Sequence, residues 1–262
     1  MGRENRSPVV SGFGRRVVVV GAAALVLSVP RPGSAQIPDE FTNLKVPPED
    51  IEQRDLLNVM RGFSIGLDVR CTYCHVGEEG QPLSTYDFAS DEKPEKRKAR
   101  EMMRMVNHIN ETVLTALPDR SEPNVSVTCA TCHAGRPRPS SLEEEMMWAY
   151  EDGGVEALTR RYRELRERYY GLGTLNFGSA PLDNVAQMLG GPPRQDLEAA
   201  LAVTDLNLEY HPDSGTTLTL RGQALAGLGR TDEAIRSLER ALELNPRNRF
   251  AERLLQQLRG GG

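Results

Sequence analysis

Residues 71–75 have the sequence Cys-Thr-Tyr-Cys-His, and residues 129–133 have the sequence Cys-Ala-Thr-Cys-His. Both are C-x-x-C-H motifs, and together they use all four cysteines of the 262-residue chain. Two thiols three positions apart can each form a thioether with one vinyl group of a haem, and the adjacent histidine then lies beneath the iron as its proximal ligand. The motifs therefore predict two covalently attached c-type haems. The expected thioether residues are Cys71, Cys74, Cys129 and Cys132, and the expected iron ligands are His75 and His133.

Three other uses of cysteine fit this pattern less well. Structural disulfides would account for four cysteines in an exported chain, but they do not require a histidine after each pair. A zinc ribbon separates its two C-x-x-C pairs by about 15 to 20 residues, whereas Cys74 and Cys129 lie much further apart. A thioredoxin-like pair requires a strand before it and a helix after it, and it would not occur twice. Covalent haem binding is the interpretation that uses every cysteine.

The first 35 residues have the pattern of an export signal. Arg15 and Arg16 precede an apolar run over residues 17–29, and the small residues 33–35 follow it as a cleavage site. Such a run rises about 20 Å as a helix, which is less than the roughly 30 Å of a bilayer core. We therefore expect residues 1–35 to be a cleaved signal peptide rather than an anchor. The mature protein would then lie in the periplasm or on the outer face of the cytoplasmic membrane, where haem is attached covalently.

The charge balance excludes a further class of function. The chain has 32 Lys and Arg against 37 Asp and Glu, a formal net charge of −5. The expected signal peptide is basic, so the mature chain is more acidic still. An acidic exported protein has no electrostatic attraction to nucleic acid, and we expect no nucleic-acid partner.

A helix is expected over residues 53–67, immediately before the first motif. Its apolar stripe consists of Leu56, Met60, Phe63 and Leu67. Gly66 and Asp68 are then expected to turn the chain toward Cys71. A methionine on such a stripe commonly fills space in a core, but a haem that needs a sixth ligand favours coordination. Met60 is therefore the candidate distal ligand of the first haem.

A second helix is expected over residues 94–117, before the second motif. Met102 and Met105 lie one turn apart on its apolar stripe, so the periodicity does not choose between them. His108 lies one turn further and would give a haem with two histidine ligands, although a solvated surface histidine is the commoner case. The charge run over residues 91–104 predicts a solvated helix face, with neutralisation of haem propionates as the alternative.

Three segments between residues 59 and 139 carry a family resemblance: Val-Met-Arg-Gly-Phe-Ser from residue 59, Val-Arg-Cys-Thr-Tyr-Cys-His from residue 69, and Val-Thr-Cys-Ala-Thr-Cys-His-Ala-Gly from residue 127. With the Met-rich helix between them, this block resembles the cytochrome c subunit of photosynthetic reaction centres. That family has four haems in two similar halves, and this chain matches one half. Each haem there lies along the helix that precedes its motif, and that helix supplies an axial methionine. The resemblance implies Met60 and Met102 as the two distal ligands.

The same resemblance implies a function. The family re-reduces a photo-oxidised pigment, so the chain is expected to carry electrons to a redox partner. Family members also place a histidine between the second helix and the second motif, where it ligates a haem of the other half. This chain has no histidine between Asn110 and His133. The electron-transfer chemistry is therefore the part of the family's function that these residues carry over.

The last third of the chain has a helical repeat. Pro212 and Pro246 are 34 residues apart, which is the tetratricopeptide period. Six further positions of the repeat are occupied by Leu218, Gly222, Leu225, Ala234, Leu238 and Ala241. We expect a turn over residues 229–231 with Thr231 as the N-cap. A degenerate unit is expected over residues 181–211, where His211 has a structural role, and a capping helix over residues 247–258.

A Pro-rich linker is expected over residues 135–141, followed by a charged helix over residues 155–170 that completes the repeats. Arrays of this kind bind a partner protein in a concave groove, and the alternative is that the repeats only brace the haem domain. We therefore expect an all-α protein: a signal peptide (1–35), a dihaem cytochrome c domain (36–140) and a tetratricopeptide-like domain (141–262).

The expected function is transfer of single electrons between redox partner proteins, among them a membrane-bound reaction-centre or respiratory complex. Methionine ligation raises the haem potential relative to two histidines, which suits such a donor. Two alternatives stay open. A dihaem peroxidase would need an open distal site, against which two available methionines argue. An assembly or scaffold protein would act through its repeats.

Overall fold

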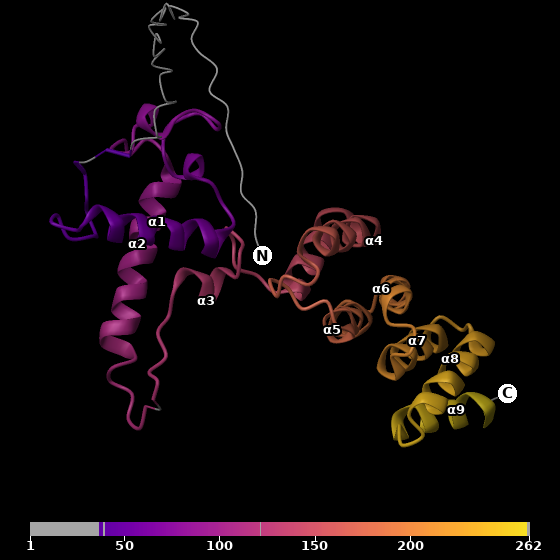
Figure 1. Cartoon of the computed structure of the whole chain (residues 1–262). Coiled ribbons are helices and arrows are strands. Elements are labelled where there is room, and N and C mark those ends of the chain that lie inside the picture. The colour runs from indigo at the N-terminus through magenta and orange to yellow at the C-terminus, as the bar shows by residue number, and fades with distance from the viewer. Residues whose placement is uncertain (1–36, 39, 121, 261–262) are drawn as a thin grey trace, which may run out of the picture.

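The computed structural model describes residues 37–38, 40–120 and 122–260 (Figure 1). The expected signal peptide lies outside the described residues. Within them the fold is all-α, as predicted, with nine α-helices, no β-strand and one isolated bridge between Val76 and Asp87. No helix of this described part is long and apolar enough to cross a bilayer.

The N-terminal part consists of helices and short turns around the two motifs (Figure 1). In chain order these are α1 (Gln53–Leu67), the 3-10 turns η1 (Cys71–Tyr73) and η2 (Leu83–Thr85), α2 (Pro94–His108), the π-helical turn η3 (Ile109–Val113) and α3 (Cys129–His133). The bounds of α1 are those that the apolar stripe predicted. The second helix was expected to continue to residue 117, but the i→i+4 ladder ends at the π-turn, where the Leu114 amide donates to the Ile109 carbonyl at 2.8 Å.

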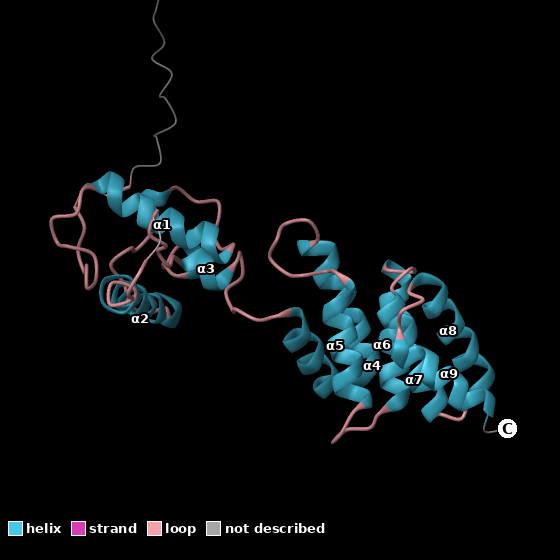
Figure 2. Ribbon diagram, turned by 90° about the horizontal axis from the view of Figure 1, so that it is seen from below, coloured by secondary structure: helices cyan, strands magenta, loops and turns pink. Residues whose placement is uncertain are grey.

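The C-terminal part is a stack of antiparallel helices, in which each of α5 to α8 packs on the next helix along the chain (Figure 2). The helices are α4 (Leu142–Tyr169), α5 (Ser179–Gly190), α6 (Leu197–Tyr210), α7 (Gly215–Gly227), α8 (Thr231–Leu244) and α9 (Arg249–Gly260). The predicted repeat corresponds to α7 and α8. Gly222 of α7 allows them to approach closely, because a Cβ there would lie 2.7 Å from Cγ of Leu238.

Several helix ends differ from the predictions. The helix expected from residue 155 begins at Leu142, because Ser141 and Glu144 form a capping box that satisfies the amides of the first turn. Non-helical backbone at Gly153 and Gly154 kinks it. Thr231 is the first helical residue of α8 rather than its N-cap; Arg230 takes that position without a side-chain cap. The last helix is shifted two residues toward the C-terminus.

The hydrophobic core is concentrated in the repeat part. One cluster of buried side chains joins α4 to α8, and a smaller one lies beneath α9. The first cluster includes Tyr162, Leu182 and Leu225, which are each 0% exposed. Among the described residues before 141, only Leu56 is a buried apolar side chain. The sequence of the N-terminal part therefore folds around the motifs with almost no protein core of its own.

Candidate haem sites

The first motif lies in η1, directly after α1. Asp68 ends α1 in the left-handed conformation (φ 53°), and the His75 amide then donates to the Cys71 carbonyl at 2.9 Å. Cys71 is exposed and Cys74 is half-buried, and neither forms a disulfide. Burial raises the pKa of the Cys74 thiol. Because neither sulfur is in a disulfide, both sulfurs of the first motif are available for thioether bonds.

His75 is half-buried, and its ring stands edge-on to Phe88 with the centroids 5.0 Å apart. Burial, followed by the charge of Lys96, lowers the pKa of His75 to about 4. The imidazole is therefore neutral near pH 7, which is the form that binds a metal. Its Nδ1 is buried and has no hydrogen-bond partner among the described residues.

The second motif forms the short helix α3. Thr128 caps it through a capping box with Thr131. Nδ1 of His133 lies 2.8 Å from the carbonyl oxygen of Arg136. Because a carbonyl only accepts, Nδ1 must carry the proton, which leaves the lone pair of Nε2 free for an iron. The local fold thus sets the tautomer that a proximal ligand needs.

Helix α1 packs against α3, so the helix that precedes the first motif also supports the second (Figure 2). The closest approach is at Gly66, where a Cβ would lie 2.9 Å from Cβ of Cys129 and 3.0 Å from the amide nitrogen of Ala130. Gly66 was expected to turn the chain, but it is a buried helical residue, and Asp68 makes the turn. The missing side chain of Gly66 allows α1 to pack closely against Cys129 and Ala130 of the second motif.

The candidate distal ligands lie on α1 and α2. Met60 is half-buried on the apolar stripe of α1. On α2, Met102 is 40% exposed and Met105 is 44% exposed, so burial does not separate them. His108 is the exposed last residue of α2. The helix is regular over this span, so His108 is rotated by about 240° from Met102. The assignment of Met60 and Met102 stays a prediction.

The exposed apolar side chains of the N-terminal part test whether a haem fits. Among the described residues before 141 they are Ile65, Tyr73, Met102, Met105, Val113, Leu117 and Val125, each at least 40% exposed. Tyr73 lies within the first motif, and Met102 and Met105 lie on the helix that precedes the second motif. A large apolar ring held by the motifs would cover such side chains, so the residues present fit a haem.

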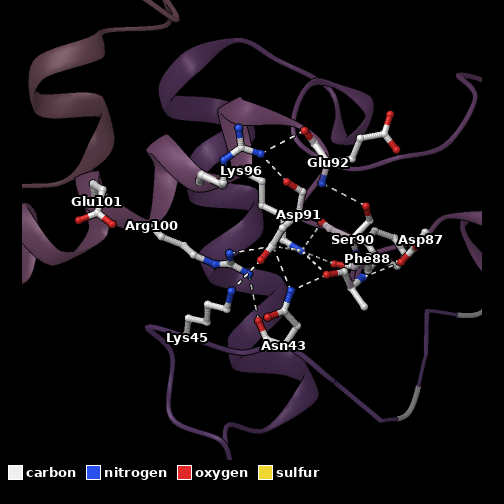
Figure 3. Close-up of polar contacts among 12 residues, drawn as sticks. Asn43, Lys45, Asp87, Phe88, Ser90, Asp91, Glu92, Lys96, Arg100 and Glu101 are labelled. Atoms are coloured by element: carbon white, nitrogen blue, oxygen red, sulfur yellow. Dashed lines mark hydrogen bonds and ion pairs between the residues drawn. The ribbon is translucent and has the colours of Figure 1, made fainter.

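The charge run of α2 is only partly a solvated face, contrary to the prediction. The side chains of Lys96 and Arg100 are each 11% exposed and converge with Lys45 on Asp91, as Figure 3 shows. Lys96 also donates to the carbonyls of Phe88, Ala89 and Ser90 at 2.7, 3.0 and 2.8 Å. Hydrogen bonds, the one from Lys45 foremost, hold the pKa of Asp91 below its usual range. These cations therefore secure the loop beside His75.

A buried ion cluster behind the second motif was also missed. Arg136, in the expected linker, has a 7% exposed side chain and pairs with Glu145 of α4 at 2.5 Å, and Arg161 reaches the other carboxylate oxygen at 2.7 Å. Among the described residues, no three His, Cys, Asp or Glu side chains converge on one metal position. His211 has the structural contact that was predicted, with Nε2 3.0 Å from the Phe177 carbonyl oxygen.

Comparison with known proteins finds matches to both parts of the chain. Residues 193–259 match a tetratricopeptide repeat family. Cytochrome c-554 of Chloroflexus aurantiacus is 39% identical over 71 residues, which are 27% of this chain and 15% of that protein. Among solved structures, the first TPR domain of human RPAP3 (20% identity, TM-score 0.33) covers 45% of this chain and 87% of that one. The Arabidopsis OM64 TPR domain (20%, 0.32) covers 45% and 92%.

The match that spans most of the chain is to the family described as photosynthetic reaction centre cytochrome C subunit. It extends over residues 24–211 and includes both C-x-x-C-H motifs, α1 and α2. This covers the resemblance drawn from the motifs and continues into the first repeat helices. The chain therefore belongs to the reaction-centre cytochrome c subunit family, with a tetratricopeptide-like module at its C-terminal end.

Proposed function

We propose that this protein is an exported dihaem c-type cytochrome that carries single electrons between redox partner proteins. One observation carries the proposal. Each C-x-x-C-H motif has two cysteines that form no disulfide, followed by a histidine. Both motifs lie in a part of the chain in which nearly all apolar side chains of the described residues are left at least partly exposed. Membership of a cytochrome c family supports electron transfer rather than an enzymatic reaction.

The residues of the chain define how each haem would be held. Cys71 and Cys74 would anchor the first haem and Cys129 and Cys132 the second, with His75 and His133 as proximal ligands. Met60 and Met102 would close the opposite sides. The haem supplies one-electron chemistry by cycling between ferric and ferrous iron, and methionine ligation favours the ferrous form.

Hydrogen bonds and charges within the protein would affect how the histidines ligate iron and how high each haem potential is. The Arg136 carbonyl keeps His133 in the tautomer that ligates through Nε2. Near the first motif, Lys96 and Arg100 are held by backbone carbonyls and by Asp91. Positive charge beside an iron that alternates between two charges favours the lower one. The first haem would therefore have the higher potential of the two.

The partners follow from the two halves of the chain. The N-terminal part would exchange electrons with a membrane-bound reaction-centre or respiratory complex outside the cytoplasm. Re-reduction of a photo-oxidised pigment is the form of this reaction that the family suggests. The repeats would bind a partner protein. A pull-down of the exported protein with membrane complexes identifies the donor and acceptor.

Haem stoichiometry of the purified, denatured protein tests the proposal. We expect two haems per chain to persist after denaturation, because thioether bonds survive unfolding, and we expect no free thiol. The double variant Cys129→Ala/Cys132→Ala should keep one haem, and so should Cys71→Ala/Cys74→Ala. Bound zinc, or haem that is extracted on denaturation, would overturn the proposal. Rapid turnover of hydrogen peroxide would favour a peroxidase instead.

A further inference from the structure

A continuous set of contacts joins the second haem motif to the repeat part. The Arg136 carbonyl accepts the Nδ1 proton of His133 at 2.8 Å. The side chain of the same arginine is 7% exposed and pairs with Glu145, which is 8% exposed. Glu145 lies on α4 between Leu142 and Met146, which are 1% and 0% exposed in the core of the repeats. One hydrogen bond and one ion pair thus connect His133, the expected proximal ligand, to Glu145 on α4 of the repeat part.

Glu145 is fully engaged at this position. Besides Arg136, it accepts from Ser140 at 2.8 Å and from two nitrogens of Arg161 at 3.1 and 2.7 Å. Burial alone would raise the pKa of Glu145, but the hydrogen bonds of Arg161, Ser140 and Arg136 outweigh it and lower the pKa. The carboxylate is therefore charged. Its removal would leave Arg136 as an unpaired buried cation, which is a costly state that the side chain would leave.

The backbone between His133 and Arg136 has little freedom of its own. Ala134 (φ 47°) and Gly135 (φ 81°) both have left-handed conformations. The Gly135 amide donates to the Gly66 carbonyl of α1 at 2.9 Å, and the Arg136 amide donates to the His133 carbonyl at 3.0 Å. The turn is thus held by α1 on one side and by Glu145 on the other. The carbonyl and the side chain of Arg136 therefore belong to one restrained turn, and loss of Glu145 would remove one of its two supports.

We propose that Glu145 is a positioning residue for the second haem. Through Arg136 it holds the carbonyl that accepts from His133, so the repeat part tunes the basicity of that iron ligand. This inference rests on the proposed function. A strong hydrogen bond from Nδ1 makes the imidazole a better donor and stabilises ferric iron. Loosening the bond therefore raises the potential of this haem alone, because Nδ1 of His75 has no corresponding partner among the described residues.

The test uses the full-length holoprotein and measures both midpoint potentials. Each haem gives one redox wave in the titration. The variant Cys71→Ala/Cys74→Ala keeps only the second haem and therefore identifies which wave belongs to it. In Glu145→Ala we expect the second wave to move upward, with a shift of up to about tenfold in its ferric–ferrous equilibrium, or 59 mV for one electron. Glu145→Gln keeps the shape of the side chain and should give a smaller shift. The first wave should not move in either variant.

Two control variants separate positioning from general loosening. Asp183→Asn alters a 4% exposed side chain that bonds Asn207 and Thr217 in the repeat core. Arg168→Gln breaks an exposed ion pair with Asp68 that also joins the two halves. Both should leave the potentials unchanged. A second readout is exchange of the His133 Nδ1 proton, measured by NMR, which should become faster in Glu145→Ala and stay slow in both controls.

Each outcome decides one question. If both haems are present while Glu145→Ala and Glu145→Gln leave the second potential and the proton exchange unchanged, the positioning role is wrong and the proposed function stands. A wild-type protein without covalent haem overturns the proposed function itself. If Glu145→Ala does not accumulate, Glu145→Gln replaces it, and an unchanged second wave in Glu145→Gln then overturns the inference. Arg161→Gln preserves the pair between Arg136 and Glu145 and is a further control, in which the second wave should not move.

Discussion

The two parts of this molecule reach order in different ways. In the repeats, the interior is built from the chain's own side chains, and Tyr162, Leu182 and Leu225 are completely buried. Before residue 141, Leu56 is the only buried apolar side chain among the described residues, while Met102 and Met105 lie in contact with solvent. From this difference we expect the motif part to depend on its proposed haems for a core, whereas the repeat part forms a core from its own side chains.

Removing the haems should have the largest effect on this comparison. In a variant with all four cysteines changed to alanine, we expect residues 37–140 to lose nearly all protection from amide hydrogen exchange, because little buried apolar surface remains to hold them. Helices α4–α9 should keep protection close to that of the holoprotein. Mass spectrometry of peptides from both parts measures this. Equal loss in both parts would mean that they share one core.

A single added methyl group should have the next largest effect. Gly66→Ala places a Cβ 2.9 Å from Cβ of Cys129, and overpacking of this kind costs about 1–3 kcal/mol. We expect fewer than two haems per chain and a lower melting temperature. The matched control is Gly62→Ala on the same helix, where no heavy atom lies within 4 Å of the added Cβ. That change should stabilise α1, since alanine exceeds glycine in helix propensity by about 1 kcal/mol. Similar behaviour of the two variants would contradict the packing of α1 on α3.

The sequence predicted those features that depend on local pattern. The bounds of α1 follow from a four-residue apolar stripe, and the repeat follows from the spacing of Pro212 and Pro246. The start of α4 also has a local signature in the sequence, because Ser141 and Glu144 have the spacing of a capping box. The expected start at residue 155 instead coincides with the interruption of the helical pattern at Gly153 and Gly154.

The features that the sequence could not predict depend on distant partners. Arg136 lies in a Pro-rich segment that has the composition of a linker, and only the arrival of Glu145 on α4 makes it a buried ion pair. Lys96 and Arg100 belong to a charge run, and their burial depends on Asp91 and on the segment at Asn43. Gly66 is likewise explained by Cys129, which lies more than sixty residues away. None of these contacts has a local signature.

Removal of one distal methionine should affect one haem and leave the repeats intact. Met60→Ala should open one iron to carbon monoxide and lower its potential, since methionine favours ferrous iron. Met102→Ala should do the same at the second iron, with partial rescue by Met105, which lies one turn away. The Met-to-iron charge-transfer band of the oxidised protein measures both changes. An unchanged band in Met102→Ala, together with a changed haem in His108→Ala, would assign two histidines to the second iron.

The smallest effect is expected where the two parts touch at the surface. The guanidinium of Arg168 lies 3.1 Å from the Asp68 carboxylate, with both side chains 62% exposed. Exposed pairs contribute about 0–1 kcal/mol, because water and salt screen them. Arg168→Gln should therefore change the free energy of unfolding by less than about 1 kcal/mol, and the difference should shrink further at high salt. Denaturant titrations followed by haem absorbance and by helical circular dichroism measure the two parts separately. A larger loss, seen by both probes, would show that this surface pair couples the parts as the buried Arg136–Glu145 pair does.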